Sequence, residues 1–188
     1  MEFRFVSEDD TEGLLDIYRQ YIDTTITFEY MLPTVDEFRK RIRHISKDYP
    51  YIVCVEEDKL LGYAYAHRYK ERQAYKWNVE FSIYLDKNLT AKGVGTKMYD
   101  MLFEIVKIQG IKNVYSLIAY PNEPSVRLHE KMGFELLVTY KNEGFKNGQW
   151  TDLMCYRKTI APHDTAPEDI KTIQQLDRKV LEEILNKF

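Results

Sequence analysis

The sequence contains few of the features that mark secreted or membrane proteins. It has only two cysteines, Cys54 and Cys155, and they form no CxxC pair. That spacing excludes a zinc site built from thiolates alone and gives no sign of a disulfide framework, so we expect two buried, reduced thiols. A run of about 18 apolar residues and a signal-peptide pattern are also lacking, which leads us to expect a cytoplasmic protein with no membrane partner.

An excess of positive charge is absent as well. Lysine and arginine number 27 against 30 aspartates and glutamates, giving a formal net charge of −3. Proteins that bind nucleic acid irrespective of its sequence usually carry a basic surplus, so we expect no nucleic-acid partner. What is present is the composition of an ordinary globular protein, 44% hydrophobic and 30% charged, with a length that suits one domain better than two.

Apolar periodicity and local end signals give the order of elements. Thr34 and Glu37 form a capping box, and Gly110 and Gly133 are placed to end two later helices. We predict strands over 3–6, 51–56, 60–69, 77–85, 114–119, 136–141 and 153–156, and helices over 10–22, 34–45, 94–106 and 122–132. A strand, two helices, a strand meander and βαβ-like units indicate an α+β fold with a mixed sheet, neither doubly wound nor a barrel.

The composition changes near residue 161. Pro162 and Pro167 bracket a polar linker, and apolar residues then recur at helical spacing from Ile170 to Leu185. This pattern predicts an amphipathic C-terminal helix that packs on the domain or on a partner chain. We therefore divide the chain into a domain of residues 1–160 and an appendage of residues 161–188.

A turn rich in glycine separates the strand that ends at Leu85 from the next helix. It reads Lys92-Gly93-Val94-Gly95-Thr96, with Lys97 following. Backbone N–H groups at a helix start are unpaired, and the helix dipole adds positive potential there, so the turn suits a pyrophosphate. Glycine matters because a side chain would hold the phosphates away from the backbone.

Better-known phosphate motifs fail at this turn. Gly95 is followed by Thr96 where a P-loop needs lysine, and Met98 stands where a dinucleotide fingerprint needs its third glycine. A third interpretation is the acyl-coenzyme A turn, in which glutamine or arginine precedes the GxG by three residues; here that position is Thr90. Taken alone, an ordinary helix start with two glycines explains the turn more simply.

Four further segments lie around the turn in the sequence. They are Thr27-Phe28-Glu29, the strand 77–85, the block YPNEPSVRLHEKMGF from Tyr120 to Phe134, and Gly144-Phe145-Lys146 with Gly148, Trp150 and Asp152. Together they resemble the GNAT acetyltransferase superfamily, and most closely its phosphinothricin acetyltransferase branch, over roughly residues 1–158. The resemblance implies a mixed, mostly antiparallel central sheet flanked by helices, with the C-terminal helix outside the match.

The same resemblance implies acetyl-CoA as co-substrate and no metal. Its pantetheine arm is expected along the backbone of Ile83, Tyr84 and Leu85, with Asn122 and Ser125 in contact. The pyrophosphate is expected on Ala91, Lys92, Gly93, Val94, Gly95 and Thr96. Thr90 departs from the arginine or glutamine usual in the family, which preserves the main-chain contacts and puts part of the phosphate affinity in doubt.

Acetyl transfer to an amine needs a base, because a free amine is mostly protonated at neutral pH. Glu80 lies on the strand that leads to the glycine turn and matches the glutamate proposed as base in this branch. Burial near aromatic residues would raise its pKa into a useful range, although position alone would suit a surface carboxylate. His129 matches the branch's histidine and is either catalytic or a half-buried helix residue, while His44, His67 and His163 are expected to be structural or solvent-facing.

The remaining candidates concern the acceptor. Arg72, near Tyr75, could pair with a substrate carboxylate, or be one solvated charge in a charged run. Phe28 and Trp77 wall the acceptor pocket or simply pack in the core. The branch also forms homodimers, in which the segment Gly144 to Lys146 would reach a neighbouring subunit's site.

Three classes of function remain open at this point. The first is an N-acetyltransferase that uses Glu80 as general base on a small amino-acid-like amine, of which phosphinothricin and methionine sulfoximine or sulfone are the type, or on peptide N-termini or other small amines. The second is an acyl-coenzyme A sensor without catalysis. The third is a dimeric interaction module built on the C-terminal helix, which would not need the glycine turn.

Overall fold

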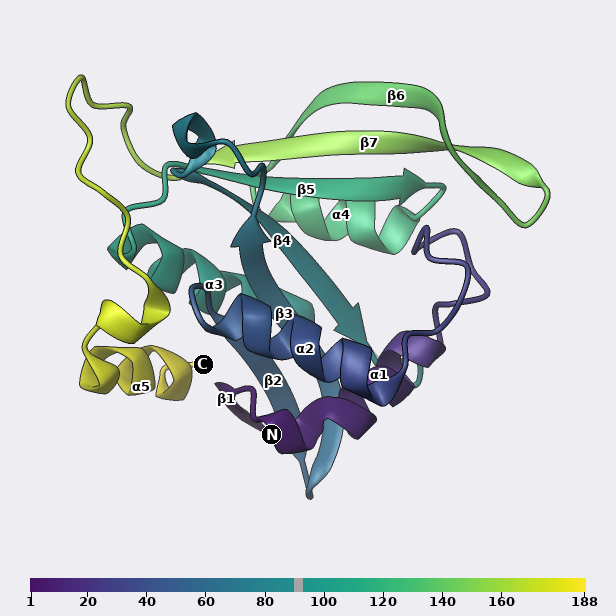
Figure 1. The fold of residues 1–188 in the computed structure, drawn as a ribbon, viewed down its shortest axis with the longest axis horizontal. Coiled ribbons are helices and arrows are strands. Elements are labelled where there is room, and N and C mark those ends of the chain that lie inside the picture. Colours follow the sequence, from purple (N-terminus) through teal and green to yellow (C-terminus); the bar gives the residue numbers. More distant parts are fainter. Residues whose placement is uncertain (90–92) are drawn as a thin grey trace.

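The computed structural model describes residues 1–89 and 93–188, and its centre is one seven-stranded sheet (Figure 1). The strands lie in the order β1-β2-β3-β4-β5-β7-β6, and only β4 and β5 pair in parallel. Their bounds are β1 Glu2–Phe5, β2 Tyr51–Glu56, β3 Lys59–Arg68, β4 Asn78–Leu85, β5 Asn113–Tyr120, β6 Glu135–Lys146 and β7 Gln149–Thr159. The prediction of a mixed, mostly antiparallel sheet is confirmed.

Helices cover both faces of this sheet. They are α1 Thr11–Arg19, α2 Val35–Ser46, α3 Val94–Ile108, α4 Glu123–Lys131 and α5 Arg178–Asn186. Side chains alternate along each strand, so Tyr63 of β3 packs with α1 and α2 while its neighbour Ala64 packs with α3 on the other face. The result is one apolar layer under α1 and α2 and a larger one between the sheet and α3 and α5.

Local signals placed most helix ends correctly. Thr34 and Glu37 form the expected capping box of α2, and the Asn122 side chain caps α4 by accepting from Ser125 N. The first helix is an exception, because it ends at Arg19 and not at 22. Bonds from Gln20 N to Ile17 O and from Tyr21 N to Tyr18 O tighten its last turn into 3₁₀ geometry and stop it.

The end of the domain differs from the prediction of two short strands around a loop. β6 and β7 form one long hairpin that closes at Asn147-Gly148. Both turn residues have positive φ, 52° and 75°, which is the backbone that a two-residue hairpin turn requires. Asn-Gly is the strongest sequence signal for such a turn, so the loop interpretation was wrong for a reason visible in the sequence.

The predicted continuous C-terminal helix is also divided. Ile173–Gln175 is a single 3₁₀ turn, Leu176 is extended, and Asp177 starts α5 by accepting from Lys179 N. The apolar stripe nevertheless packs on the domain, since Ile173 and Leu181 are buried in the larger apolar layer. None of the helices in the described chain is long and apolar enough to cross a membrane.

Candidate active site

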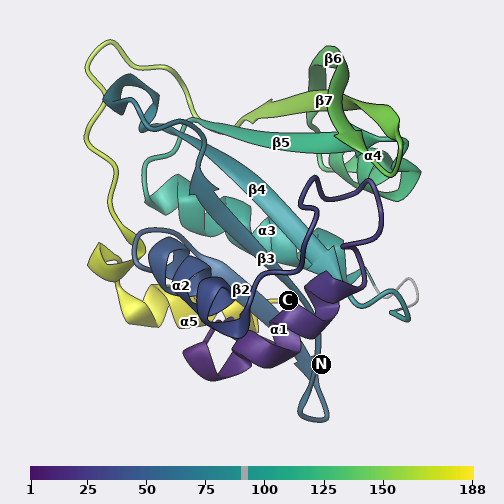
Figure 2. The same cartoon turned by 45° about the vertical axis from the view of Figure 1, so that its right-hand side comes forward.

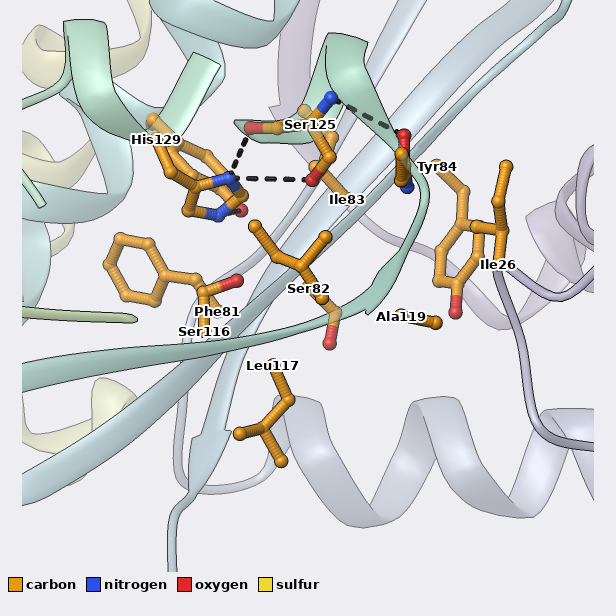
Figure 3. Close-up of a pocket in the computed structure, with 13 residues that line it drawn as sticks. Ile26, Phe81, Ser82, Ile83, Tyr84, Ser116, Leu117, Ala119, Ser125 and His129 are labelled. Carbon is orange, nitrogen blue, oxygen red and sulfur yellow. Dashed lines mark hydrogen bonds between the residues drawn. The ribbon is translucent and has the colours of Figure 1, made fainter. Parts of the chain in front are cut away.

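The sheet opens between its two parallel strands. β4 and β5 pair over only three positions, ending at Glu80 and Tyr115, and their C-terminal halves then diverge (Figure 2). A cavity of about 70 Å³ lies in the gap (Figure 3). Residues 82–84 of β4 and 117–119 of β5 line it. Because the ladder ends before these residues, backbone groups that face the gap can bond a ligand there.

The glycine turn at the start of α3 has two glycines with different roles. Gly93 is the helix's N-terminal cap in a left-handed conformation, φ 71°, and nothing lies within 4 Å of where its Cβ would be. Gly95 is buried, and a Cβ there would sit 3.3 Å from Leu128 and 3.4 Å from Ile83. The reason given from sequence, close approach of a phosphate, therefore suits Gly93, whereas Gly95 lets α3 approach β4 and α4.

Other predicted coenzyme contacts are partly engaged within the protein. The Leu85 carbonyl accepts a hydrogen bond of 2.5 Å from the Tyr21 hydroxyl, and Lys97 Nζ donates to Phe188 O. Val94 and Thr96 stand in the first turn of α3, where backbone N–H groups have no partner within the helix. Thr90, Ala91 and Lys92 lie outside the described residues.

The N-terminus of α4 forms another wall of the cavity. Asn122 and Ser125 both line it. The Asn122 side-chain oxygen accepts from Ser125 N at 3.4 Å, which leaves the amide N–H groups of Asn122 available to a ligand. The predicted pair thus lies together beside the gap between β4 and β5.

His129 is fully buried one turn further along α4, and its protonation follows from its partners. Nδ1 lies 2.7 Å from Ser125 O, which can only accept, so Nδ1 carries the proton (Figure 3). Nε2 lies 3.0 Å from the Tyr99 hydroxyl and therefore accepts from it. Burial lowers the pKa of His129 to about 4, so the ring is neutral at pH 7. This bonding favours an orienting role.

Tyr99 was missed by the sequence reasoning. It stands on α3 between the core residues Met98 and Met101. Tyr99 is buried and lines the cavity, and its hydroxyl donates to His129 Nε2. Tyrosine inside an apolar helical stripe carries a hydroxyl that needs a partner when buried, which is a signal the sequence did contain.

Glu80 lies at the last parallel pair, on the sheet face that carries the tyrosines of β3. Its side chain is 17% exposed and is flanked by His67 across from it on β3 and by Tyr115 on β5. Desolvation raises the pKa of the carboxyl to about 7. The expected rise is therefore present, and about half of the Glu80 side chains are ionised at pH 7.

His67 is a second residue that the sequence reasoning set aside. Its Nε2 lies 3.9 Å from Glu80 Oε1, and burial lowers the pKa of the ring, so it is neutral at pH 7. The expectation that it is merely structural or solvent-facing rested on the absence of partner spacing along the chain. The partner is set by the β3–β4 register, in which His67 and Glu80 stand directly opposite each other.

A second, larger cavity lies on the same sheet face as Glu80. Its volume is about 300 Å³, and Tyr84 lines both this cavity and the one between β4 and β5. Its lining is Tyr18, Thr27, Glu29, Phe38, Arg41, Ile42, His44, Ile45, Tyr51, Tyr63, Tyr65 and Tyr84. An ion pair of 2.5 Å between Arg41 and Glu29 is its main charged feature. The sequence analysis did not predict that either residue of this ion pair lines a cavity.

The predicted acceptor residues are dispersed. Arg72 is exposed at the cap of a short 3₁₀ turn, and Tyr75 is half-buried in that turn, between the ends of β3 and β4. Phe28 lies in the loop between α1 and α2, with its ring against Gly144. Trp77 donates from Nε1 to Glu168 O at 2.8 Å, so it packs on the C-terminal linker and lines neither cavity described above.

Comparison with known proteins gives consistent relatives. A family model described as an acetyltransferase (GNAT) domain matches residues 3–155. A phosphinothricin N-acetyltransferase from Streptomyces viridochromogenes is 34% identical over 180 residues, 94% of this chain and 96% of that protein. An L-methionine sulfoximine/L-methionine sulfone acetyltransferase from Pseudomonas aeruginosa is 27% identical over 162 residues, 84% and 94% of the two chains.

A solved structure shares the whole fold. It is a GNAT superfamily phosphinothricin acetyltransferase from Sinorhizobium meliloti in complex with AcCoA, which superposes with a TM-score of 0.85 and is 30% identical. The match covers 93% of this chain and 96% of the other, so it extends beyond the residues of the family model.

Proposed function

The chain belongs to the GNAT acetyltransferase family, and we propose that it transfers an acetyl group from acetyl-CoA to the amine of a small amino-acid-like acceptor. The observation that carries this proposal is Glu80, a partly buried carboxyl that stands where β4 and β5 separate and whose pKa desolvation raises to about 7. Phosphinothricin and methionine sulfoximine or sulfone are the first acceptors to test, since relatives are named for them.

The residues around the gap fit the coenzyme. The edges of residues 82–84 and 117–119 that face the gap suit an amide-bearing pantetheine arm, and Asn122, which lines the same cavity, uses its side-chain oxygen to cap α4. The left-handed Gly93 cap presents the first N–H groups of the 15-residue helix α3 to a pyrophosphate without an intervening side chain. When bound, acetyl-CoA supplies the activated acyl group.

Glu80 takes the proton that the amine loses. With a pKa near 7, its ionised form is well populated at neutral pH and is still basic enough to accept a proton, directly or through one water. As nitrogen forms its bond to the acyl carbon, the thioester C–S bond breaks and the thiolate leaves. Backbone N–H groups along the separated strands polarise the carbonyl. No covalent intermediate with the protein is needed.

Residues around Glu80 and the cavity between β4 and β5 support the proposed reaction. Neutral His67 lies beside Glu80 and adds no positive charge there, so desolvation sets the raised pKa of the carboxyl. His129 and Tyr99 form a buried hydrogen-bonded pair under the cavity and fix the wall against which the acyl end of the coenzyme lies. Arg72 and Tyr75 provide acceptor contacts at the end of β4 that bears Glu80.

We also propose a homodimer, formed through the β6–β7 hairpin. β6 is an edge strand of the sheet, and exposed edges are usually covered or blunted. Large apolar side chains stand exposed on this hairpin, namely Leu136, Leu137, Val138, Tyr140, Phe145 and Trp150. A cluster of this kind is typical of an interface. The proposal assigns catalysis to residues 1–160 and a supporting role to residues 161–188.

A thiol-release assay tests the activity. The purified chain is incubated with acetyl-CoA and a panel of amino acids, analogues and N-terminal peptides, and free CoA is measured with a thiol reagent, with Glu80→Gln as the control. Release that depends on an amino-acid-like amine and on Glu80 supports the proposal. Coenzyme A-dependent thermal stabilisation without release from any amine would contradict it and favour a sensor.

A further inference from the structure

Lys146, at the end of β6, is a buried lysine whose hydrogen bonds, among the described residues, go to main-chain carbonyls. It is 3% exposed, and its Nζ donates to Ile22 O at 2.7 Å and to Thr27 O at 2.6 Å. Burying an ammonium group is costly unless it is well bonded, and burial does lower the pKa of this lysine. A lysine held in this way stabilises whatever segment supplies the carbonyls, here residues 22–30.

Three other contacts join the same two parts of the chain. Asn147 Nδ2 donates to Asp23 O at 2.9 Å, the Tyr30 hydroxyl donates to Phe145 O, and the Phe28 ring lies against Gly144. We call residues 144–148 the hairpin tip and residues 22–30 the acceptor loop. In Figure 1 the far end of the β6–β7 hairpin lies beside the loop that joins α1 to α2.

The acceptor loop forms part of both cavities. Ile26 lines the cavity between β4 and β5, and Thr27 and Glu29 line the larger one. On the side away from the hairpin tip, the loop is joined to α1 and α2, because Thr27 Oγ1 lies 2.6 Å from the Tyr18 hydroxyl and Glu29 pairs with Arg41. The loop therefore has anchors on two sides, and Lys146 provides the charged anchor on the hairpin side.

We propose that the larger cavity receives the amine acceptor and that Lys146 is a positioning residue that sets the shape of this acceptor cavity by holding the acceptor loop. It acts through the loop and does not touch the acceptor. This inference rests on the proposed acetyl transfer to an amine. It differs from the expectation that the segment Gly144 to Lys146 serves a neighbouring subunit, since the Lys146 ammonium is used within its own chain.

The test compares Lys146→Met with Lys141→Met. Lys141 stands on the same strand, is exposed and pairs with Asp152 on the surface, so its loss removes a lysine without touching the loop. Lys146→Met should raise the KM for the amine by about tenfold or more and the KM for acetyl-CoA by much less. Lys146 bonds the carbonyl of Thr27, which lines the larger cavity, whereas the cavity between β4 and β5 receives only Ile26 from the described part of this loop. Lys141→Met should change neither. A merely structural role would lower the active fraction and leave both KM values unchanged.

Gly144→Ala tests whether the hairpin tip positions the acceptor loop if Lys146→Met does not fold. A Cβ at this position would lie 2.5 Å from the Phe28 ring, so alanine displaces that ring and leaves Lys146 in place. It should raise the KM for the amine in the same selective way. Unchanged amine KM in the folded variants, or an equal rise in the KM for acetyl-CoA, overturns the proposal.

Hydrogen exchange separates this proposal from the proposed function. The amides of residues 22–30 should exchange faster in Lys146→Met than in the wild type, and at the wild-type rate in Lys141→Met. If the wild type acetylates no amine, the proposed function fails, and exchange still tests the anchor by itself. Equal protection of the loop in all three proteins would show that Lys146 does not hold it.

Discussion

Replacing Glu80 by glutamine should separate catalysis, stability and coenzyme binding. A general base typically contributes about 10²- to 10⁴-fold to the rate, so Glu80→Gln should lower kcat by at least about a hundredfold. Glu80 does not line the cavity between β4 and β5, so coenzyme affinity should hardly change. An unaffected rate would refute the assignment of Glu80 as base.

The pH profile gives a second measurement on the same variant. Since burial raises the pKa of Glu80 to about 7, kcat of the wild type should fall below pH 7 and reach about a tenth of its plateau at pH 6. The glutamine variant should lose this limb and keep only the one set by the amine itself. An identical limb in both proteins would assign it to another group.

Stability should move in the opposite direction to activity. The pKa of Glu80 is raised above its usual 4.5, so the folded state favours the protonated form. Stability from this group is fully present below pH 4.5 and is lost as the pH rises through 7, a difference of about 3 kcal/mol as an upper bound. Glu80→Gln should therefore melt at a higher temperature than the wild type at pH 8 and at a similar one at pH 4. A lower melting temperature at pH 8 would contradict the burial argument.

Three further substitutions probe the coenzyme turn, the buried pair and the acceptor contact. Gly93→Glu should weaken acetyl-CoA binding by more than about tenfold in calorimetry, since a carboxylate would face the pyrophosphate. Gly93→Ala introduces the strain of a positive φ without that charge. Equal affinities of the two variants for acetyl-CoA would refute a pyrophosphate site at Gly93. Tyr99→Phe leaves His129 Nε2 buried without its hydrogen-bond donor. The free energy of unfolding measured in urea titrations should fall by about 1–3 kcal/mol, and an unchanged value would argue against the Tyr99–His129 bond. Arg72→Ala should raise the KM for a carboxylate-bearing amine and leave that of its decarboxylated analogue unchanged, so equal changes for both would exclude carboxylate pairing.

Features encoded within a few residues were predictable. Asn122 and Thr34 cap helices from one position, and Gly93 and Gly133 take the left-handed backbone that their places require. The family-like blocks gave the fold and brought Glu80, Asn122 and Ser125 to the separation of β4 and β5. The helix caps and the glycine conformations could be predicted without knowing which strands are neighbours in the sheet.

The features that the sequence did not predict depend on contacts between residues far apart in the chain. His67 meets Glu80 only because the β3–β4 hairpin fixes their register, and a slip by one residue would turn His67 to the other face. Lys146 reaches carbonyls more than a hundred residues earlier in the chain, which no local pattern encodes. The apolar residues from 170 onward recur at helical spacing and so predicted one continuous helix. The structure has a 3₁₀ turn and α5, separated by the extended Leu176, and both pack on the same apolar layer.

Tyr84 lines both cavities, so an occupant of either cavity contacts a residue that also bounds the other. Any movement of Tyr84 that one occupant favours changes the space left to the other. If the coenzyme tightens acceptor binding by some factor, the acceptor must tighten coenzyme binding by the same factor. Under the proposed function, Tyr84 would couple the binding of two unlike substrates, and binding isotherms of each in the presence of the other would measure that coupling.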